Sequence, residues 1–195
     1  GYARAGLAAV MIEDQVAPKR CGHTQGKQVV PRDQALVRLR DALDARDEGA
    51  DILVMARTDA RQTHGFDEAL ARGRAFAELG ADMVFVEAPE SVDEMRVLCR
   101  EIQAPCMADL LDHGRSPIVT PAELEAIGYK LAAYPLTLLT VAIDAMRSSL
   151  ATLAQRRHPG VPLDFRTVQK IVGFDEYDVQ QSRYSTRGRE PSDDT

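Results

Sequence analysis

The sequence contains few cysteines and lacks the motifs of several common enzyme classes. Its three cysteines, Cys21, Cys99 and Cys106, have neither the spacing of a disulfide framework nor that of a zinc site. A Gly-rich phosphate loop and a Gly-x-Ser-x-Gly nucleophile elbow are both absent. These absences exclude the usual zinc, phosphate-loop and serine-hydrolase classes, and unpaired cysteines favour a reducing compartment such as the cytoplasm.

Long apolar runs and an excess of positive charge are also missing. The longest apolar stretch, residues 131–143, is interrupted by Tyr134 and Pro135 and is too short to cross a bilayer. The net charge of −6 argues against binding to nucleic acid or to anionic lipid. Because apolar residues make up 45% of the chain, a substantial core is expected. The sequence therefore predicts a soluble, cytoplasmic protein without nucleic-acid or membrane partners.

Short apolar segments alternate with longer amphipathic segments through the first 155 residues. This alternation predicts parallel strands joined by right-handed helical crossovers, which is an α/β fold. A helical extension is expected over residues 156–184 and a disordered tail over residues 185–195. The predicted strands cover residues 10–12, 52–56, 83–86, 106–108 and 130–133, and the predicted helices cover residues 31–46, 66–79, 92–102, 121–127, 136–155 and 164–172.

Polar side chains stand at the end of each predicted strand. In parallel sheets and barrels the carboxyl ends of the strands meet at one rim, where active sites are built. Taken singly, each residue could be a solvated surface group, and Arg57 could simply pair with Asp59. A polar residue at every strand end in turn favours a shared site. The strand-end residues are Glu13 and Asp14, Arg57 and Asp59, Glu87, Asp109, and Tyr134.

The loop after the first strand collects a thiol and several cations in the string Lys19-Arg20-Cys21-Gly22-His23. Neighbouring positive charge favours the thiolate, so Cys21 is a candidate reactive group. A solvated basic loop with an incidental cysteine would explain the same residues, and local chemistry alone does not separate the two interpretations.

The strand-end carboxylates suggest a metal-assisted site for a small acid. Hard oxygen ligands such as Glu13 suit Mg²⁺ or Mn²⁺, often with water intervening. Arg57 offers a fork that can bind a substrate carboxylate. We therefore expect a divalent cation and a small-molecule carboxylate substrate at this rim.

The same residues carry a resemblance to a known family. The loop string, preceded by Ile12-Glu13-Asp14-Gln15, resembles the isocitrate lyase and phosphoenolpyruvate mutase superfamily, in particular its 2-methylisocitrate and 2,3-dimethylmalate lyase branch. The resemblance extends from residue 1 to about residue 184. Further matching segments are Ala56-Arg57-Thr58-Asp59-Ala60, Val86-Glu87-Ala88 and Tyr134-Pro135-Leu136.

The resemblance implies a (β/α)₈ barrel that binds Mg²⁺ and cleaves a 2-hydroxy di- or tricarboxylate by retro-aldol chemistry, giving pyruvate or another 2-oxo acid. Cys21 would protonate the carbanion, Glu13 would meet Mg²⁺ through water, and Glu87 would orient the substrate hydroxyl or a metal-bound water. The implied catalytic residues are Lys19, Cys21, His23 and Glu87, and the implied substrate-binding residues are Cys21, Gly22, His23, Arg57, Glu87 and Asp109.

Two departures from the family pattern bear on the substrate. Members that cleave tricarboxylates usually carry Asn and Thr where this chain has Asp109 and Leu111, and an arginine where it has Thr137 and Thr140. A third substrate carboxylate would then lack a partner. The sequence therefore predicts a smaller, dicarboxylic substrate such as a substituted malate.

The family's first three strands, its base and its paired metal-binding aspartates would all precede Gly1. The chain is thus expected to hold the last five βα units, to be inactive alone, and to exchange the helix at 136–155 between subunits of a homotetramer. Three alternatives stay open: phosphorus–carbon chemistry of the phosphoenolpyruvate mutase or phosphonopyruvate hydrolase type, oxaloacetate decarboxylation, and an inactive barrel fragment. Cys21 counts against the first of them.

Overall fold

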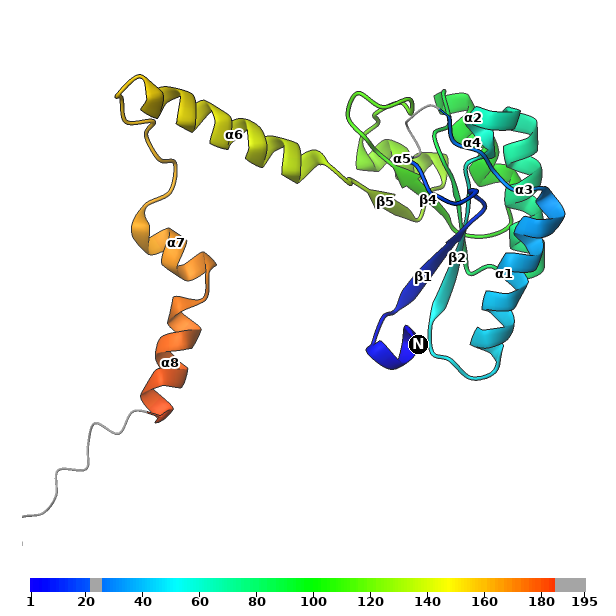
Figure 1. Cartoon of the computed structure of the whole chain (residues 1–195), viewed down its shortest axis with the longest axis horizontal. Coiled ribbons are helices and arrows are strands. Elements are labelled where there is room, and N and C mark those ends of the chain that lie inside the picture. The colour runs from blue at the N-terminus through cyan, green and yellow to red at the C-terminus, as the bar shows by residue number, and fades with distance from the viewer. Residues whose placement is uncertain (22–25, 185–195) are drawn as a thin grey trace, which may run out of the picture. The chain divides into compact units, whose positions relative to one another are not determined.

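The computed structural model describes residues 1–21 and 26–184. The described part contains one five-stranded parallel sheet with the strands in sequence order (Figure 1). Sequential parallel pairing is what consecutive βα units of a barrel produce, and it confirms the predicted fold class. The strands are β1 (Ala9–Glu13), β2 (Leu53–Thr58), β3 (Met83–Val86), β4 (Cys106–Asp109) and β5 (Leu131–Ala133).

Helices fill the crossovers between these strands, close to the positions that hydrophobic periodicity predicts. Both α1 and α3 pack on β2, and they lie on the same side of the sheet (Figure 1). The prediction missed one short helix, α2, because its five residues are too few to show a helical period. The crossover helices are α1 (Arg32–Asp47), α2 (Ala60–His64), α3 (Phe66–Leu79), α4 (Val92–Glu101) and α5 (Pro121–Ile127).

Side chains alternate between the two faces of the sheet, and the two faces differ in cover. On the helix-covered face, residues such as Val54 and Val84 are 1% and 0% exposed and belong to the main core. On the opposite face, a smaller apolar cluster is formed by Met55, Phe85 and Met107. The polar strand-end residues described below divide between these two faces, because successive residues of a strand point to opposite sides.

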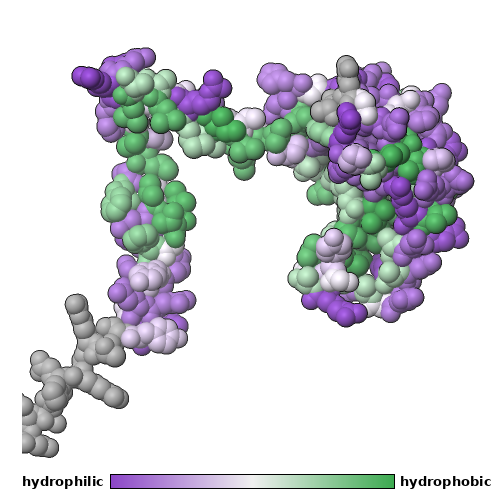
Figure 2. Space-filling model, in the orientation of Figure 1, coloured by the Kyte–Doolittle hydropathy of each residue, from purple (hydrophilic) through white to green (hydrophobic). Residues whose placement is uncertain are grey.

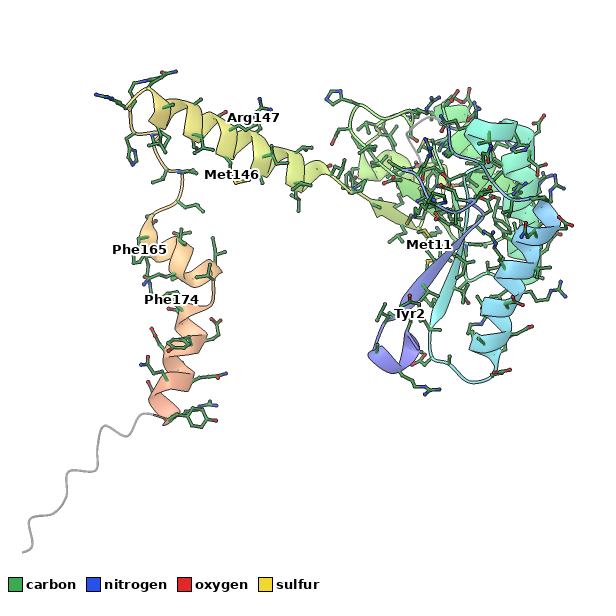
Figure 3. The ribbon with its side chains drawn as sticks, in the orientation of Figure 1. Tyr2, Met11, Met146, Arg147, Phe165 and Phe174 are labelled. Carbon is green, nitrogen blue, oxygen red and sulfur yellow. The ribbon has the colours of Figure 1, made fainter. Side chains whose placement is uncertain are left out.

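The apolar character of the second face continues to its margins. Met11 on β1, labelled in Figure 3, is 40% exposed, and Leu53 and Leu131 are 48% and 45% exposed. Hydrophobic residues, green in Figure 2, gather in the region where Figure 1 shows β1 and β2. On this face, apolar side chains therefore cover the strands up to the polar residues at their carboxyl ends.

Side chains cap the amino ends of α5 and α4 in different ways. Thr120 and Glu123 form a complete capping box at the start of α5. At α4, Ser91 accepts the hydrogen bond from the backbone N–H of Glu94. The Glu94 carboxylate does not complete a capping box with Ser91, because it accepts from the backbone N–H of Glu90 and from Arg61.

The chain divides into two compact units, Gly1–Val141 and the segment from Ala142 onward, so the division falls within α6 (Thr137–Ala154). The second unit contains α7 (Phe165–Ile171) and α8 (Phe174–Tyr184), which contact each other. No residue of α6 is buried, and Leu138 and Leu150 are 84% and 65% exposed. Within the described part of the chain, no helix has both the length and the apolarity that a membrane span requires.

Candidate active site

The polar residues at the strand ends form two networks, one on each face of the sheet. Glu13, Arg57 and Glu87 share the face of the small apolar cluster, since they follow Met11, Met55 and Phe85 by two positions. Asp14 and Thr58 are the next residues along their chains and point to the opposite face, toward α3. We call the first group the rim cluster and the second, together with Arg72, the helix-side network.

Arg57 is the centre of the rim cluster. Its Nε donates to Asp59 Oδ2 at 2.9 Å and its Nη2 to Asp59 Oδ1 at 3.2 Å, so Asp59 takes the side-on fork of the guanidinium. Arg57 Nη2 also lies 3.1 Å from Glu87 Oε2, and Nε lies 3.5 Å from Glu13 Oε2. The guanidinium stands 4.9 Å from the centroid of the Phe85 ring, a cation–π contact. Nη1 makes no hydrogen bond to any residue that the structure describes.

Two lysines complete the rim cluster from the segment that follows β1. Lys27 Nζ donates to Asp59 Oδ1 at 2.8 Å, and both side chains are almost fully buried. Lys19 Nζ pairs with Glu13 Oε2 at 2.8 Å in a more exposed position. The cluster thus interleaves cations and carboxylates rather than separating them.

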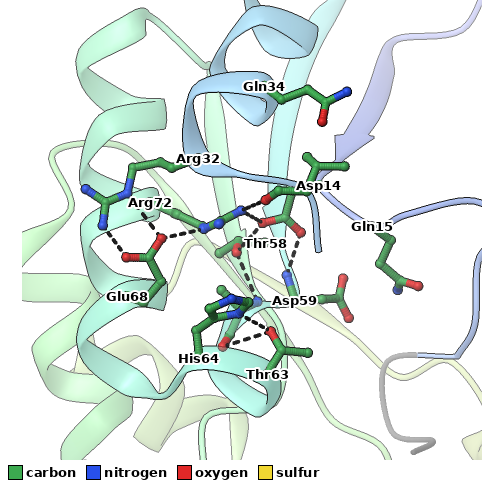
Figure 4. Close-up of polar contacts among 12 residues, drawn as sticks. Asp14, Gln15, Arg32, Gln34, Thr58, Asp59, Thr63, His64, Glu68 and Arg72 are labelled. Carbon is green, nitrogen blue, oxygen red and sulfur yellow. Dashed lines mark hydrogen bonds and ion pairs between the residues drawn. The ribbon is translucent and has the colours of Figure 1, made fainter. Parts of the chain in front are cut away.

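The helix-side network is enclosed and hydrogen-bonded within itself (Figure 4). Asp14 Oδ2 accepts from Thr58 Oγ1 at 2.6 Å and from Arg72 Nη1 at 3.0 Å, while Asp14 Oδ1 accepts from the backbone N–H of Asp59 at 3.0 Å. Arg72 also donates to the carbonyl of Val30. The prediction that Asp14 joins the other carboxylates at the rim is therefore wrong, because its position beside Glu13 in an extended strand turns it to the other face.

The segment carrying Cys21 is held at its base. The carbonyl of Asp14 accepts from the backbone N–H of Val30, and Gln15 pairs with Val29 in an isolated antiparallel bridge. The buried Gln15 carboxamide also makes two 3.0 Å hydrogen bonds with the backbone of Arg20, the residue before Cys21. Cys21 itself is exposed. A thiol on the surface of an anchored segment is accessible to a reactant.

Burial and charge set the protonation of the rim carboxylates. Burial raises the pKa of Glu87 to about 7; Arg57 opposes this rise, whereas Asp59 and Asp109 add to it. Burial also acts to raise the pKa of Asp59, but hydrogen bonds from Arg57 and Lys27 outweigh it and bring that pKa below its ordinary value. One carboxyl of the cluster therefore titrates near neutral pH while its neighbour stays ionised.

The structure brings most of the predicted site residues together. Lys19, Glu13, Arg57 and Glu87 are linked by ion pairs, and Asp109 is close enough to act on the charge of Glu87. Gly22 and His23, predicted to hold a carboxylate, lie outside the described residues. Tyr134 is 45% exposed and makes no hydrogen bond within the described part of the chain.

Sequence reasoning missed Lys27 altogether and treated Asp59 only as the partner of Arg57. Lys27 carries no sequence signal, since it is a single lysine in a polar stretch and its partner lies 32 positions further on. The predicted fork of Arg57 also needs correction. Asp59 occupies its side-on edge and Glu87 Oε2 lies 3.1 Å from Nη2, so a substrate carboxylate can meet the end-on edge mainly at Nη1.

The metal site predicted at Glu13 stays a prediction. Among the described residues, no group of three or more His, Cys, Asp or Glu side chains is arranged to hold a metal ion. The carboxylate of Glu13 is engaged by Lys19 and approached by Arg57. The described residues alone therefore do not make a ligand set, and the water-mediated role of Glu13 is not tested by them.

Lys27 also lines a cavity of about 660 Å³. Residues 26–29, residues 62–64 and Arg115 form its walls. A volume in this range is typical of sites for small ligands. The rim cluster therefore adjoins an accessible space on the side where Lys27 and α2 meet.

Parallel βα units with charged side chains gathered at the carboxyl ends of the strands define an α/β protein of the (β/α)₈ barrel class. Residues 1–154 match the family model described as phosphoenolpyruvate phosphomutase. The chain belongs to this family, which forms part of the isocitrate lyase and phosphoenolpyruvate mutase superfamily.

Individual relatives agree with this assignment. The chain is 43% identical over 145 residues to 2,3-dimethylmalate lyase of Eubacterium barkeri, covering 74% of this chain and 50% of that protein. It is 34% identical over 191 residues to 2-methylisocitrate lyase of Aeropyrum pernix, covering 96% and 61%. A crystal structure of 2,3-dimethylmalate lyase superposes with a TM-score of 0.85 at 34% identity, covering all of this chain and 66% of that one. The chain thus spans one half to two thirds of the length of these relatives.

Proposed function

We propose that the protein is a carbon–carbon lyase that cleaves a small 2-hydroxy dicarboxylate into a 2-oxo acid and a carboxylic acid. The observation that carries the proposal is the rim cluster, in which Arg57 is held among Glu13, Asp59 and Glu87 while its Nη1 makes no hydrogen bond to a described residue. A guanidinium held in this way can donate from Nη1 to a substrate carboxylate, and such charge-assisted hydrogen bonds are strong. The lyase names of two relatives support the reaction class.

The reaction needs a hydroxyl proton to leave, a carbon–carbon bond to break and a carbon to be protonated. Arg57 binds one substrate carboxylate, and Glu87 orients the 2-hydroxyl group, whose proton passes to a general base. The C2–C3 bond then breaks; C2 becomes the carbonyl carbon of the 2-oxo acid, and the electron pair passes to C3 beside the second carboxylate. The Cys21 thiol gives its proton to C3. The proton held by the general base then returns through solvent to the thiolate, so the cycle consumes no net proton.

The charge of Arg57 stabilises the transition state because negative charge grows on the carboxylates as the bond breaks. A Glu87 carboxyl with a pKa of about 7 can accept or donate a hydrogen bond near neutral pH, which suits the orientation of a hydroxyl group. Exposure of Cys21 at the anchored segment suits its role as the proton donor.

A requirement for Mg²⁺, or for Mn²⁺ in its place, is part of the proposal. When bound, the cation would neutralise charge on the substrate, and Glu13 would contribute to its hydration shell. The test is a turnover assay after chelation with EDTA and re-addition of either metal. Full turnover in EDTA would remove the metal from the proposal.

The proposed substrate is dicarboxylic because the positions at which the family pattern places partners for a third carboxylate, among them Asp109, Thr137 and Thr140, carry no positive charge in this chain. Asp109 places a further negative charge near Glu87. Thr137 donates its hydroxyl hydrogen to Asp112, and Thr140 donates to carbonyls of its own helix turn. These hydroxyl groups are already used and carry no charge, so a substituted malate fits better than a tricarboxylate.

The test is release of 2-oxo acid by the full-length protein from a panel that contains 2,3-dimethylmalate and 2-methylisocitrate. We expect turnover of the malate at a higher kcat/KM than of the tricarboxylate. Cys21→Ser should lower kcat by roughly 10²- to 10⁴-fold, the range of general acid catalysis, whereas the control Cys99→Ala should not. Faster cleavage of 2-methylisocitrate would contradict the substrate, and full activity of Cys21→Ser would contradict the mechanism.

Exposed apolar side chains on α6 support a second proposal, that this helix is exchanged between subunits of a homotetramer. Leu138, Val141 and Leu150 are 84%, 64% and 65% exposed, which is unusual for large apolar residues of a helix. Light scattering should give the mass of a tetramer for the full-length protein and a smaller mass for Leu150→Asp.

A further inference from the structure

Lys27 and Asp59 form an ion pair whose two side chains are almost completely buried. The Lys27 side chain is 1% exposed, the Asp59 side chain is 0% exposed, and Nζ lies 2.8 Å from Oδ1. Removing an ammonium group from water costs several kcal/mol, so a buried lysine persists only where its partner compensates that cost. Lys27 belongs to no helix or strand, whereas Asp59 directly follows β2 and is the N-cap residue of α2.

Asp59 joins the two polar networks. Its backbone N–H donates to Asp14 Oδ1 in the helix-side network, which fixes the position of its main chain. Its carboxylate accepts from Arg57 Nε and Nη2 in the rim cluster. The main chain of Asp59 is therefore held from one face of the sheet, and its side chain acts on the other.

The direction of the Asp59 carboxylate determines where the Arg57 guanidinium points. Both side-on donors of Arg57 bind Asp59, so rotation of the carboxylate would turn the guanidinium with it. Lys27 binds the oxygen that Nη2 also contacts, Oδ1, and thus restrains that rotation.

We infer that Lys27 is a positioning residue that fixes the orientation of the Arg57 guanidinium through Asp59. The inference rests on the proposed function, because Arg57 is the group assigned to the substrate carboxylate. Without Lys27, one restraint on Asp59 is lost, and Arg57 can shift toward Glu87 or Glu13, whose carboxylates lie 3.1 Å and 3.5 Å from its donors. The Arg57 guanidinium would then no longer have a single orientation toward the substrate carboxylate.

The test compares Lys27→Met with a matched ion-pair variant, Arg61→Met, in the full-length protein. Arg61 pairs with Glu94 at 2.8 Å and with Glu90 at 3.0 Å, outside the rim cluster. Two readouts are measured: KM and kcat for the 2-hydroxy dicarboxylate that the wild type cleaves best, and the affinity for malonate, an unreactive dicarboxylate, by calorimetry.

We expect Lys27→Met to raise KM and to weaken malonate binding by about 10- to 100-fold, with a smaller change in kcat, as for other residues that orient a ligand-binding group. Arg61→Met should change neither readout by more than about 2-fold. Equal effects of the two variants, or unchanged malonate affinity in Lys27→Met, would overturn the inference.

A second variant covers the case in which Lys27→Met does not fold. Lys27→Arg keeps the charge but lengthens the side chain and changes its donor geometry, so it should fold and weaken malonate binding by about 3- to 10-fold. Unchanged malonate binding in Lys27→Arg would then overturn the inference.

The outcomes separate this inference from the proposed function. A wild-type protein that cleaves no 2-hydroxy acid but binds malonate refutes the lyase reaction, and the malonate affinities of the variants still decide the role of Lys27. A wild-type protein that does not bind malonate refutes the inference as well, because Arg57 would then serve no carboxylate.

Discussion

The rim cluster and the helix-side network are built from neighbouring residues of the same strands, yet their carboxylates differ in how their hydrogen bonds and ion pairs are shared. In the helix-side network, both oxygens of Asp14 accept hydrogen bonds from Thr58, Arg72 and the backbone. In the rim cluster, Arg57 is shared among three carboxylates. Burial raises the pKa of both Asp14 and Glu87, and that of Glu87 reaches about 7. A network whose donors and acceptors pair with one another contributes mainly to stability, whereas a cluster that divides one guanidinium among three carboxylates is sensitive to protons and to charged ligands.

The comparison predicts that mutations in the two groups will have different consequences. Loss of a helix-side residue should lower stability with little specific effect on ligand binding. Loss of a rim residue should change binding, turnover or pH dependence more than it lowers stability. The three predictions below run from the largest expected effect to the smallest.

Arg72→Met should have the largest effect on stability. It leaves the buried Asp14 carboxylate without its cation, which costs on the order of 3–5 kcal/mol. Urea unfolding at pH 7.5 measures the loss. The control Arg32→Met removes an exposed pair with Glu68 and should cost less than about 1 kcal/mol. Equal losses in the two variants would show that the helix-side network does not stabilise the fold.

Arg57→Lys should act mainly on turnover. The lysine keeps a positive charge but has no planar fork, so it cannot bind Asp59 and a substrate carboxylate at the same time. We expect kcat/KM for the dicarboxylate to fall by roughly 100-fold. Arg72→Lys makes a matched change on the other face of the sheet and should leave the malonate affinity of the folded protein unchanged. Weaker malonate binding in Arg72→Lys alone would reverse the assignment of the two networks.

Glu87→Gln should stabilise the protein above neutral pH. The folded-state pKa of Glu87 lies near 7, above its ordinary value of 4.5, so the protonated form favours folding. That contribution is complete below about pH 4.5 and is lost as the pH rises to about 7. Glutamine mimics the protonated form, so the variant should be more stable than wild type at pH 8 by on the order of 1–3 kcal/mol, and the difference should shrink at pH 5.

The control Glu94→Gln should change the stability at pH 8 in the opposite direction. Hydrogen bonds from Arg61 and from the backbone of Glu90 outweigh burial and lower the pKa of Glu94, so its charged form favours folding. This variant should therefore be less stable than wild type at pH 8. Both measurements are urea titrations in EDTA, and a stabilising effect of both variants at pH 8 would contradict the special environment of Glu87.

Much of the fold could be predicted from hydrophobic periodicity. β3 has the predicted bounds of 83–86, and α3 begins and ends at the predicted residues, 66 and 79, because Gly80 with a φ of 104° ends the helix. The helical extension predicted over residues 156–184 contains α7 and α8, although separate bounds were predicted only for the first of these helices.

The sequence predicted which residues form the candidate site better than it predicted which of them pair with one another. Glu13, Arg57 and Glu87 could be recognised because polar residues at the ends of apolar strands are a local signal. The opposite orientation of the Asp14 and Glu13 side chains could also have been predicted from the sequence, since neighbouring residues in a strand point to opposite faces. The pairing of Lys27 with Asp59 had no local signal at all.

The order of strands and helices, the family and the residue types at the strand ends could all be inferred from the amino-acid sequence. Each of these depends on periodicity, on turn residues or on short strings, all of which act over a few neighbouring positions. Three properties emerge only when the chain is folded: Asp59 links the two networks, Lys27 is buried against Asp59, and burial raises the pKa of Glu87 to about 7. These properties depend on distance and burial, which are set when segments far apart in the chain pack together.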